Sequence, residues 1–149
     1  MTMNERQTFL VAAVRILRAP YAIDRDFDYR IPEHMENRVS RGSLVSVPFG
    51  RSNRRETALC MAVREIGADE APKGLKSIAD TVPEAYDTDE EQFALCEFLS
   101  RHTLCTMGEA VYTVLPASVR RGHENIRYRR MISMPKKQNG AFLTLEEAV

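Results

Sequence analysis

The chain has 149 residues, of which 44% are hydrophobic and 28% charged, and its formal net charge is zero. This length suits one domain with a core and part of a second, and the zero net charge excludes a uniformly polybasic protein. Because the start lacks the apolar core of a signal peptide and no run approaches the roughly 18 apolar residues of a membrane span, we expect a cytoplasmic protein without a membrane partner.

Short apolar stretches separated by turn residues fill the first half of the chain. Five of them have the length and the β-branched or alternating character of strands: 9–17, 27–31, 43–49, 57–66 and 75–82. Charged or polar loops lie between them, including the arginine-rich loop 50–56. Four or five short strands joined by turns favour a small antiparallel β-barrel.

Helical patterns follow the predicted strands. Thr88 and Glu91 have the spacing of a capping box, which predicts a helix from about Asp89 to Arg101. A second, shorter helix is predicted over 108–115, before a proline. The fold class is therefore mainly β, with C-terminal helices that would close one open end of the barrel.

The composition changes again after residue 118. Arginines and lysines dominate from Val119, and Thr144 and Glu147 form another capping box only a few residues before the sequence ends. A helix of one turn does not persist alone, so we expect that the sequence breaks off at the start of a further domain. Residues 1–118 are thus predicted to form the barrel domain, and 119–149 a basic linker with the incomplete start of the next domain.

The sequence lacks the motifs of common catalytic sites. It contains no G-x-x-x-x-G-K-S/T phosphate loop, and no Ser-His-Asp or paired-carboxylate arrangement can be recognised. Its three histidines lie far apart, and its three cysteines show no C-x-x-C spacing. We therefore expect reduced thiols, no metal site, no cofactor and no catalysis by this chain.

The residue types that stand out suit nucleotide binding. In Phe27-Asp28-Tyr29 an aromatic ring can stack on a base while the carboxylate accepts a hydrogen bond from a sugar hydroxyl. The alternative is an ordinary strand with aromatic residues in the core and Asp28 in water. A regular strand places Phe27 and Tyr29 on one face and Asp28 on the other, so one pocket for all three requires a kink.

A second set of candidates follows the predicted strand 43–49. Gly50 leaves room for a base to approach the backbone. Lys76 can pack its stem beside a base while its ammonium meets a phosphate. Arg51, Arg54 and Arg55 can supply weaker phosphate contacts, which a protein of zero net charge must make locally.

At these residues the chain resembles the PriA family of replication-restart helicases, also called primosomal protein N′. The matching segments are Phe27-Asp28-Tyr29, 45–51, Leu75-Lys76, Cys105-x-x-Gly108-Glu109 and Leu115-Pro116, in the order of the family. The resemblance is to the N-terminal domain, which captures the 3′ end of a nascent strand at a stalled fork. It implies that Phe27, Asp28, Tyr29, Gly50 and Lys76 form the pocket for the 3′-terminal nucleotide, with Asp28 on the terminal hydroxyl.

The resemblance also implies what this chain lacks. In the family a winged-helix domain follows, and then two helicase lobes with the ATP site and zinc-binding cysteines, so none of those activities or cofactors would belong to this chain. The implied partners are DNA with a free 3′ end and forked DNA, with other primosome proteins and single-stranded DNA-binding protein as further candidates. Two alternatives stay open: a general single-stranded DNA- or RNA-binding barrel without end selectivity, and a protein-interaction barrel.

Overall fold

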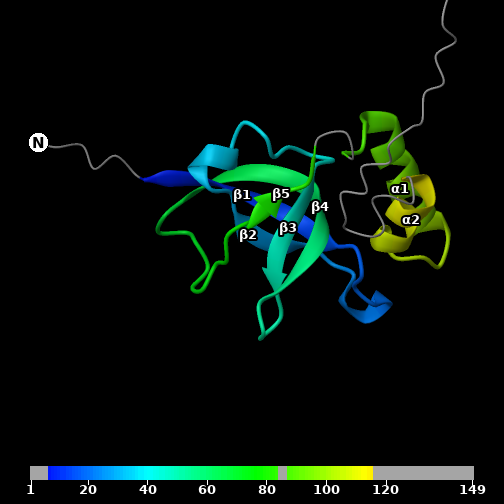
Figure 1. The fold of residues 1–149 in the computed structure, drawn as a ribbon, viewed down its shortest axis with the longest axis horizontal. Helices are drawn as coiled ribbons and strands as arrows, with labels where there is room; N and C mark the ends of the chain where they lie inside the picture. The colour runs from blue at the N-terminus through cyan, green and yellow to red at the C-terminus, as the bar shows by residue number, and fades with distance from the viewer. Residues whose placement is uncertain (1–6, 84–86, 116–149) are drawn as a thin grey trace, which may run out of the picture.

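The computed structural model describes residues 7–83 and 87–115, which form one antiparallel sheet with two helices at one end (Figure 1). The predicted linker and further domain in 119–149 lie outside the described residues. The sheet order is β2-β1-β4-β3-β5. The elements are β1 (Thr8–Ile16), β2 (Phe27–Arg30), β3 (Leu44–Phe49), β4 (Arg54–Gly67), β5 (Asp80–Thr81), α1 (Glu90–His102) and α2 (Met107–Val114), with 3-10 turns at Tyr21–Ile23 and Glu33–Met35.

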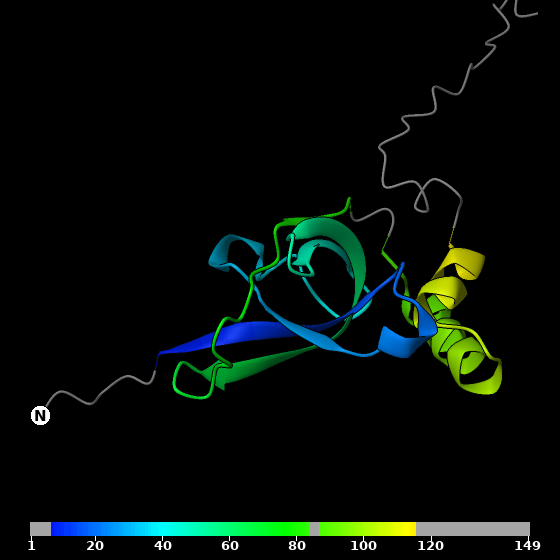
Figure 2. The same ribbon diagram turned by 90° about the horizontal axis from the view of Figure 1, so that it is seen from below.

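The 14-residue strand β4 organises the sheet. Its first part pairs with β3 and its second part with β1, so that it connects the two halves of the sheet. The register against β1 shifts between Ala13 and Val14, whose partners are Ala62 and Cys60, so Met61 is the extra residue of a β-bulge. A bulge bends the strand that carries it and increases its twist, and the sheet curls accordingly (Figure 2).

The two edges of the curled sheet approach each other without a ladder among the described residues. Arg30, at the end of β2, forms an isolated parallel bridge with Ser77, which lies shortly before β5. The Arg30 amide donates to Lys76 at 2.8 Å, and the Ile78 amide donates to the Arg30 carbonyl at 3.0 Å. Only Asp80–Thr81 of the predicted strand 75–82 pairs as a strand, with β3. The five-stranded antiparallel sheet is confirmed, and the closed barrel stays a prediction.

Two hydrophobic clusters hold the fold together. The first lies inside the curl of the sheet, where strand alternation directs Ala12, Val14, Val45 and Val47 inward. The second joins the sheet to the helices: Leu44 and Leu59 pack with Phe93 and further residues of α1 and α2. Both predicted helices therefore exist and bury one face against the end of the sheet. The helices of residues 7–83 and 87–115 lack the length and apolar character of a membrane span.

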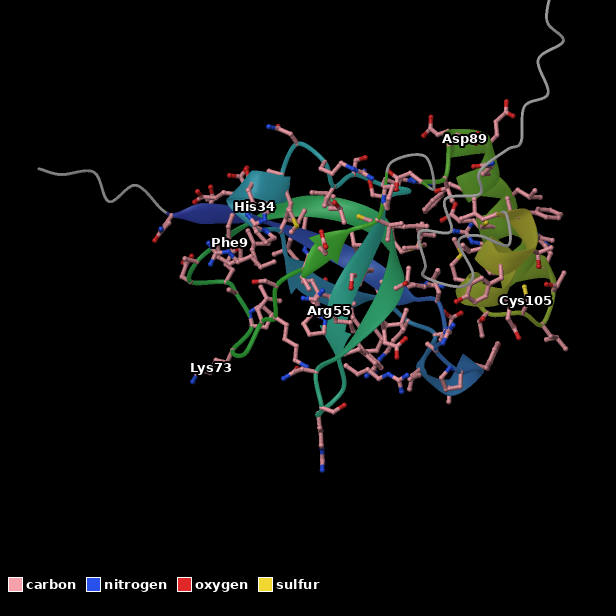
Figure 3. All side chains as sticks on the ribbon, in the orientation of Figure 1. Phe9, His34, Arg55, Lys73, Asp89 and Cys105 are labelled. Atoms are coloured by element: carbon pink, nitrogen blue, oxygen red, sulfur yellow. The ribbon has the colours of Figure 1, made fainter. Side chains whose placement is uncertain are left out.

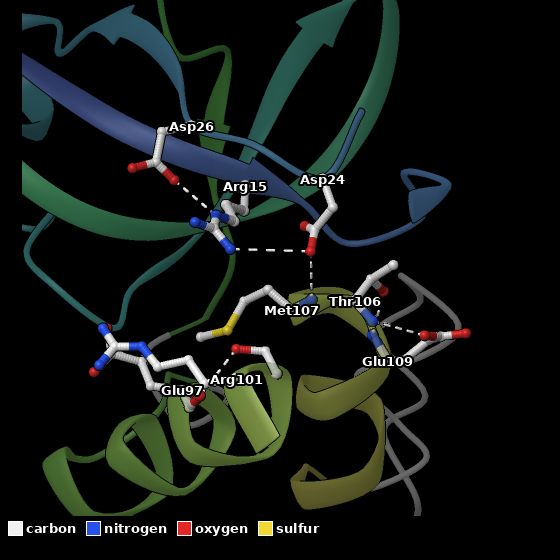
Figure 4. Close-up of polar contacts among 9 residues, drawn as sticks. Arg15, Asp24, Asp26, Glu97, Arg101, Thr106, Met107 and Glu109 are labelled. Atoms are coloured by element: carbon white, nitrogen blue, oxygen red, sulfur yellow. Dashed lines mark hydrogen bonds and ion pairs between the residues drawn. The ribbon is translucent and has the colours of Figure 1, made fainter. Parts of the chain in front are cut away.

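The N-terminus of α2 is anchored to the loop before β2 (Figure 4). The amide of Met107 donates to Asp24 Oδ2 at 2.9 Å, which satisfies one of the amides that a helix start leaves free. Thr106 and Glu109 form a reciprocal capping box at the same end. Arg15 holds Asp24 and Asp26 at 3.9 Å and 2.7 Å, so it connects β1 to the same loop.

The capping box of α1 is not the predicted pair of Thr88 and Glu91. Asp89 is the N-cap and exchanges hydrogen bonds with Gln92, one residue further along. The reason is tertiary: the hydroxyl of Thr88 donates to the carbonyl of Gly42 at 2.9 Å, and its amide donates to the same oxygen at 3.0 Å. Thr88 therefore connects the helix start to the loop before β3 and is not available as a cap.

Candidate nucleic-acid interface

The turn between β3 and β4 is short and exposes its backbone. Phe49 pairs with Arg54, so only residues 50–53 form the loop. Gly50 has φ +71° and Asn53 φ +50°, both in the left-handed region that glycine and asparagine tolerate. A Cβ on Gly50 would meet nothing within 4 Å, so this backbone is open to an approaching group. The prediction of a loop over 50–56 was wrong for 54–56, where β4 has already begun.

An open pocket of about 630 Å³ lies beside this turn. It is formed by β2, the end of β3, the turn and the segment before β5. Its lining residues are Phe27, Tyr29, Phe49, Gly50, Arg51, Asn53 and Lys76. Five of these were predicted from the sequence as binding residues. Phe49 and Asn53 were missed, although Phe49 directly precedes Gly50 at the end of a predicted half-buried strand.

Two phenylalanines give the pocket an aromatic wall. The rings of Phe27 and Phe49 lie 5.2 Å apart between centroids at an interplanar angle of 77°, an edge-to-face contact. Both side chains are only partly buried against the core inside the sheet. They therefore combine a fixed geometry with an accessible apolar surface, which is what stacking on a base requires.

Tyr29 lines the pocket and connects two of the strands that form it. Its side chain is buried, at 4% exposure, and its hydroxyl donates to the carbonyl of Pro48 at 2.8 Å. Burial raises the pKa of the Tyr29 phenol, because the charged phenolate would lose its hydration. The hydrogen bond connects β2 to the end of β3, so Tyr29 fixes the position of the residues that carry the pocket wall.

Lys76 crosses the pocket to the turn. Its Nζ donates to the carbonyl oxygen of Gly50 at 2.8 Å. This contact brings together two residues that were predicted independently. Because one carbonyl occupies a single donor of the ammonium, Lys76 retains two donors for a ligand.

Asp28 points to the opposite face of β2, as the alternation of a regular strand requires. Its carboxylate accepts a hydrogen bond from Arg64 Nη2 at 2.5 Å. That hydrogen bond raises the pKa of the Arg64 guanidinium. The register of β2 on β1 is regular through Asp28, so the kink that would turn all three side chains into one pocket is not present.

The backbone of Asp28 faces outward at the edge of the sheet. The Ile31 amide donates to Leu10, which identifies a hydrogen-bonded pair of the antiparallel ladder. Such pairs alternate, so Tyr29 bonds to β1 while Asp28 and Arg30 do not. The Arg30 amide indeed donates away from β1, to Lys76. The N–H and C=O of Asp28 are therefore directed away from β1, next to the pocket residues Phe27 and Tyr29.

Positive charge remains unneutralised near the pocket. Among residues 7–83 and 87–115, no carboxylate lies within 4.0 Å of Arg51, Arg55 or Lys76, whereas Arg54 has Glu56 at 3.8 Å. Arg54 and Arg55 open β4 directly after the turn and do not line the pocket. Cations without carboxylate partners are the groups that a phosphate backbone would neutralise.

A cleft larger than this pocket lies elsewhere. It has about 680 Å³, lies between the loop after β1 and α2, and includes Tyr21, Leu104 and Tyr112. It contains none of the predicted binding residues, so size alone does not identify the candidate site.

Within the described part of the chain no group of three potential metal ligands occurs. His34 and Cys105 lie at opposite ends of the molecule (Figure 3).

Comparisons with known proteins identify the family. The model of the PriA 3′ DNA-binding domain matches residues 16–116. Replication restart protein PriA of Bacillus subtilis (strain 168) is 34% identical over 102 residues, which are 68% of this chain and 12% of that protein. Replication restart protein PriA of Chlamydia trachomatis serovar D is 26% identical over 124 residues, 81% of this chain and 15% of that protein. The chain, which thus spans only a small part of these relatives, belongs to the family of PriA 3′ DNA-binding domains.

Proposed function

We propose that this chain is the DNA-binding module of a replication-restart protein and recognises the 3′-hydroxyl end of a nascent strand at a stalled fork. One observation carries the proposal. Five residues predicted as nucleotide contacts come from three separate segments and line one pocket. The chain's membership of the PriA 3′ DNA-binding domain family supports DNA as the ligand.

The terminal base stacks in the pocket and is read without sequence preference. Phe27 and Phe49 offer aromatic surface, and every base has a π face that can use it. The exposed backbone at Gly50 and the ammonium of Lys76 lie where they can bind the edge of a base or its phosphate. Contacts of this kind position a nucleotide and do not select its identity.

Asp28 accepts the hydrogen bond of the terminal hydroxyl in this proposal. Its carboxylate lies on the other face of β2 from the aromatic wall, so in this proposal the terminal sugar reaches past the edge of the sheet, where β2 lies, and the carboxylate exchanges Arg64 for its hydroxyl. The two side chains are 32% and 50% exposed, and an exposed ion pair of this kind contributes only about 0–1 kcal/mol. The exchange is therefore inexpensive. A carboxylate attracts a hydroxyl and repels a phosphate, which is the source of the proposed end selectivity.

The wider role follows from the family. In our proposal the curled sheet acts as a small barrel that binds and does not catalyse, and ATP hydrolysis, unwinding and zinc binding belong to other parts of the full-length proteins. The chain then needs no cofactor of its own. Its partners are forked DNA with a free 3′ end, other primosome proteins and single-stranded DNA-binding protein, in the cytoplasm where the chromosome is replicated.

Fluorescence anisotropy with short labelled oligonucleotides tests this function. Oligonucleotides with a free 3′-hydroxyl, a 3′-phosphate or a blocked 3′ end are compared at low and moderate salt. We expect the free hydroxyl to bind best and Asp28→Ala to abolish the difference. Asp26→Ala is the matched control, because Asp26 is also an arginine-paired carboxylate of the same segment. This control should keep the preference.

The other outcomes define the competing functions. Equal binding of all three ends would show a general single-strand binder without end selectivity, and binding would still weaken as salt rises. No binding by the chain at any salt concentration would contradict the proposal and favour a protein-interaction module. Loss of the preference in Asp26→Ala as well as in Asp28→Ala would assign the effect to the segment as a whole.

A further inference from the structure

Arg25 does not line the pocket itself, but its side chain lies against Phe27, one of the two rings of the aromatic wall. Its guanidinium carbon is 5.2 Å from the centroid of the Phe27 ring, a cation–π arrangement. The residue is exposed and belongs to the loop that leads into β2, where its amide donates to the carbonyl of Ile23 at 2.9 Å. The guanidinium is thus held beside the ring that is proposed to stack on a base.

The carboxylates next to Arg25 in the sequence are engaged elsewhere. Asp24 and Asp26 both pair with Arg15, at 3.9 Å and 2.7 Å. Asp28 pairs with Arg64. Within the described residues no carboxylate lies within 4.0 Å of the Arg25 guanidinium, which lies against the Phe27 ring. Both aspartates of this loop are thus paired with Arg15, and in the described part of the chain Arg25 is left as a cation without a carboxylate partner beside Phe27.

We infer that Arg25 contacts the backbone phosphate adjacent to the base that stacks on Phe27. This inference rests on the proposed function and adds a residue to it. A guanidinium forms two parallel hydrogen bonds with a phosphate, and its contact with the ring limits its freedom before the ligand arrives. A side chain that is already restricted loses less entropy on binding, so Arg25 contributes more to affinity than a freely moving surface arginine.

The test combines Arg25→Ala with oligonucleotides in which one linkage near the 3′ end is replaced by an uncharged methylphosphonate. The last three linkages are replaced one at a time, and affinities are measured by anisotropy. We expect Arg25→Ala to weaken binding of the unmodified strand about tenfold at low salt. At one linkage the methylphosphonate should weaken the wild type but not Arg25→Ala. The slope of log affinity against log salt should fall by about 0.7, the value for one phosphate contact on a single strand.

Arg30→Ala is the matched control, because Arg30 is also exposed and lies over an aromatic ring, that of Phe9 at 4.5 Å, which does not line the pocket. It should keep the affinity and every linkage effect of the wild type. Arg25→Lys retains the charge but not the two parallel hydrogen bonds, so it should keep the salt slope of the wild type and recover only part of the affinity. Thermal unfolding of each variant checks that the fold is intact.

Two results would overturn the inference while DNA binding stands. One is Arg25→Ala binding like Arg30→Ala; the other is additive losses at all three linkages. If the strand binds equally well with a blocked 3′ end, end recognition fails, but coupling of Arg25 to one phosphate would still support the contact. If the wild-type chain binds no strand, the inference and the proposed function are both wrong.

Discussion

Lys76 donates a hydrogen bond from Nζ to the carbonyl oxygen of Gly50 at 2.8 Å, across 26 positions of sequence. It connects the segment before β5 to the turn between β3 and β4, on either side of the pocket. An exposed hydrogen bond of this kind adds little to the free energy of unfolding, about 1 kcal/mol or less. Its consequence is therefore local: it orients the ammonium of Lys76 toward the exposed backbone.

Replacing Lys76 by methionine should weaken binding of a single strand about tenfold at low salt, because it removes a cation from the pocket while keeping most of the stem. The free energy of unfolding should change by less than about 1 kcal/mol. Anisotropy and urea unfolding measure the two quantities. Lys73→Met, an exposed lysine of the same connection that does not line the pocket, is the control and should bind like the wild type. Equal losses in the two variants would point to net charge as the cause.

Phe27 and Tyr29 should separate binding from stability. Phe27→Leu removes aromatic surface from the pocket wall, and we expect binding to weaken about tenfold or more. Tyr29→Phe keeps the buried ring but leaves the Pro48 carbonyl without its donor, which should cost about 1–2 kcal/mol of folding free energy. Its effect on affinity should be small. Weaker binding by Tyr29→Phe than by Phe27→Leu, in anisotropy at a temperature where both are folded, would contradict this division.

The strands could be predicted because they depend on local patterns, whereas the grouping of Phe27, Tyr29, Gly50 and Lys76 in one pocket came from the family resemblance. Alternation places Phe27 on one face and Asp28 on the other, and the structure follows that rule. Phe49, Asn53 and Arg25 could not be found in this way. Their positions depend on the register of β3 on β4 and on the course of the loop before β2, which bring distant residues together.

The start of α1 shows the same limit. Two overlapping capping boxes fit the sequence, Thr88 with Glu91 and Asp89 with Gln92. Local chemistry does not distinguish them, since threonine and aspartate are both good N-caps. The choice is made by Gly42, whose carbonyl accepts both hydrogen bonds of Thr88 from another part of the chain. Tertiary contacts of this kind leave no signal in the local sequence.

The buried thiols should make the protein less stable at high pH. Burial raises the pKa of Cys60 to about 12 and that of Cys96 to about 11, from an ordinary value of 9.0. Above about pH 9 the unfolded chain releases these protons while the folded chain keeps them, so the free energy of unfolding falls as pH rises. Each group contributes a slope of up to about 1.4 kcal/mol per pH unit, until the folded thiol itself ionises.

Urea unfolding at pH 8, 9, 10 and 11 measures this slope. Cys96→Ala lowers stability at every pH because it leaves a cavity, but it should also remove the share of the pH dependence that belongs to this thiol. The difference between the wild type and Cys96→Ala should therefore shrink as pH rises from 9 to 11. A difference that stays constant over this range would show that Cys96 ionises equally in both states.

Gly108→Ala gives a prediction whose sign is opposite to that from helix propensity. Alanine in α2 should be favoured over glycine by up to about 1 kcal/mol. A Cβ at this position, however, would lie 1.8 Å from the carbonyl oxygen of Leu17 and 2.6 Å from its carbonyl carbon. These are backbone atoms, and the Leu17 amide is held by Thr57 at 3.0 Å, so they cannot move aside like a flexible side chain. We expect a net loss of about 2–3 kcal/mol in the free energy of unfolding, as in overpacked cores.

Thr113→Ala, at an exposed position of α2, makes a similar gain in helix propensity without the close contact and should be neutral or slightly stabilising. If Gly108→Ala unfolds at a higher urea concentration than the wild type, the close packing of α2 on the end of β1 is wrong.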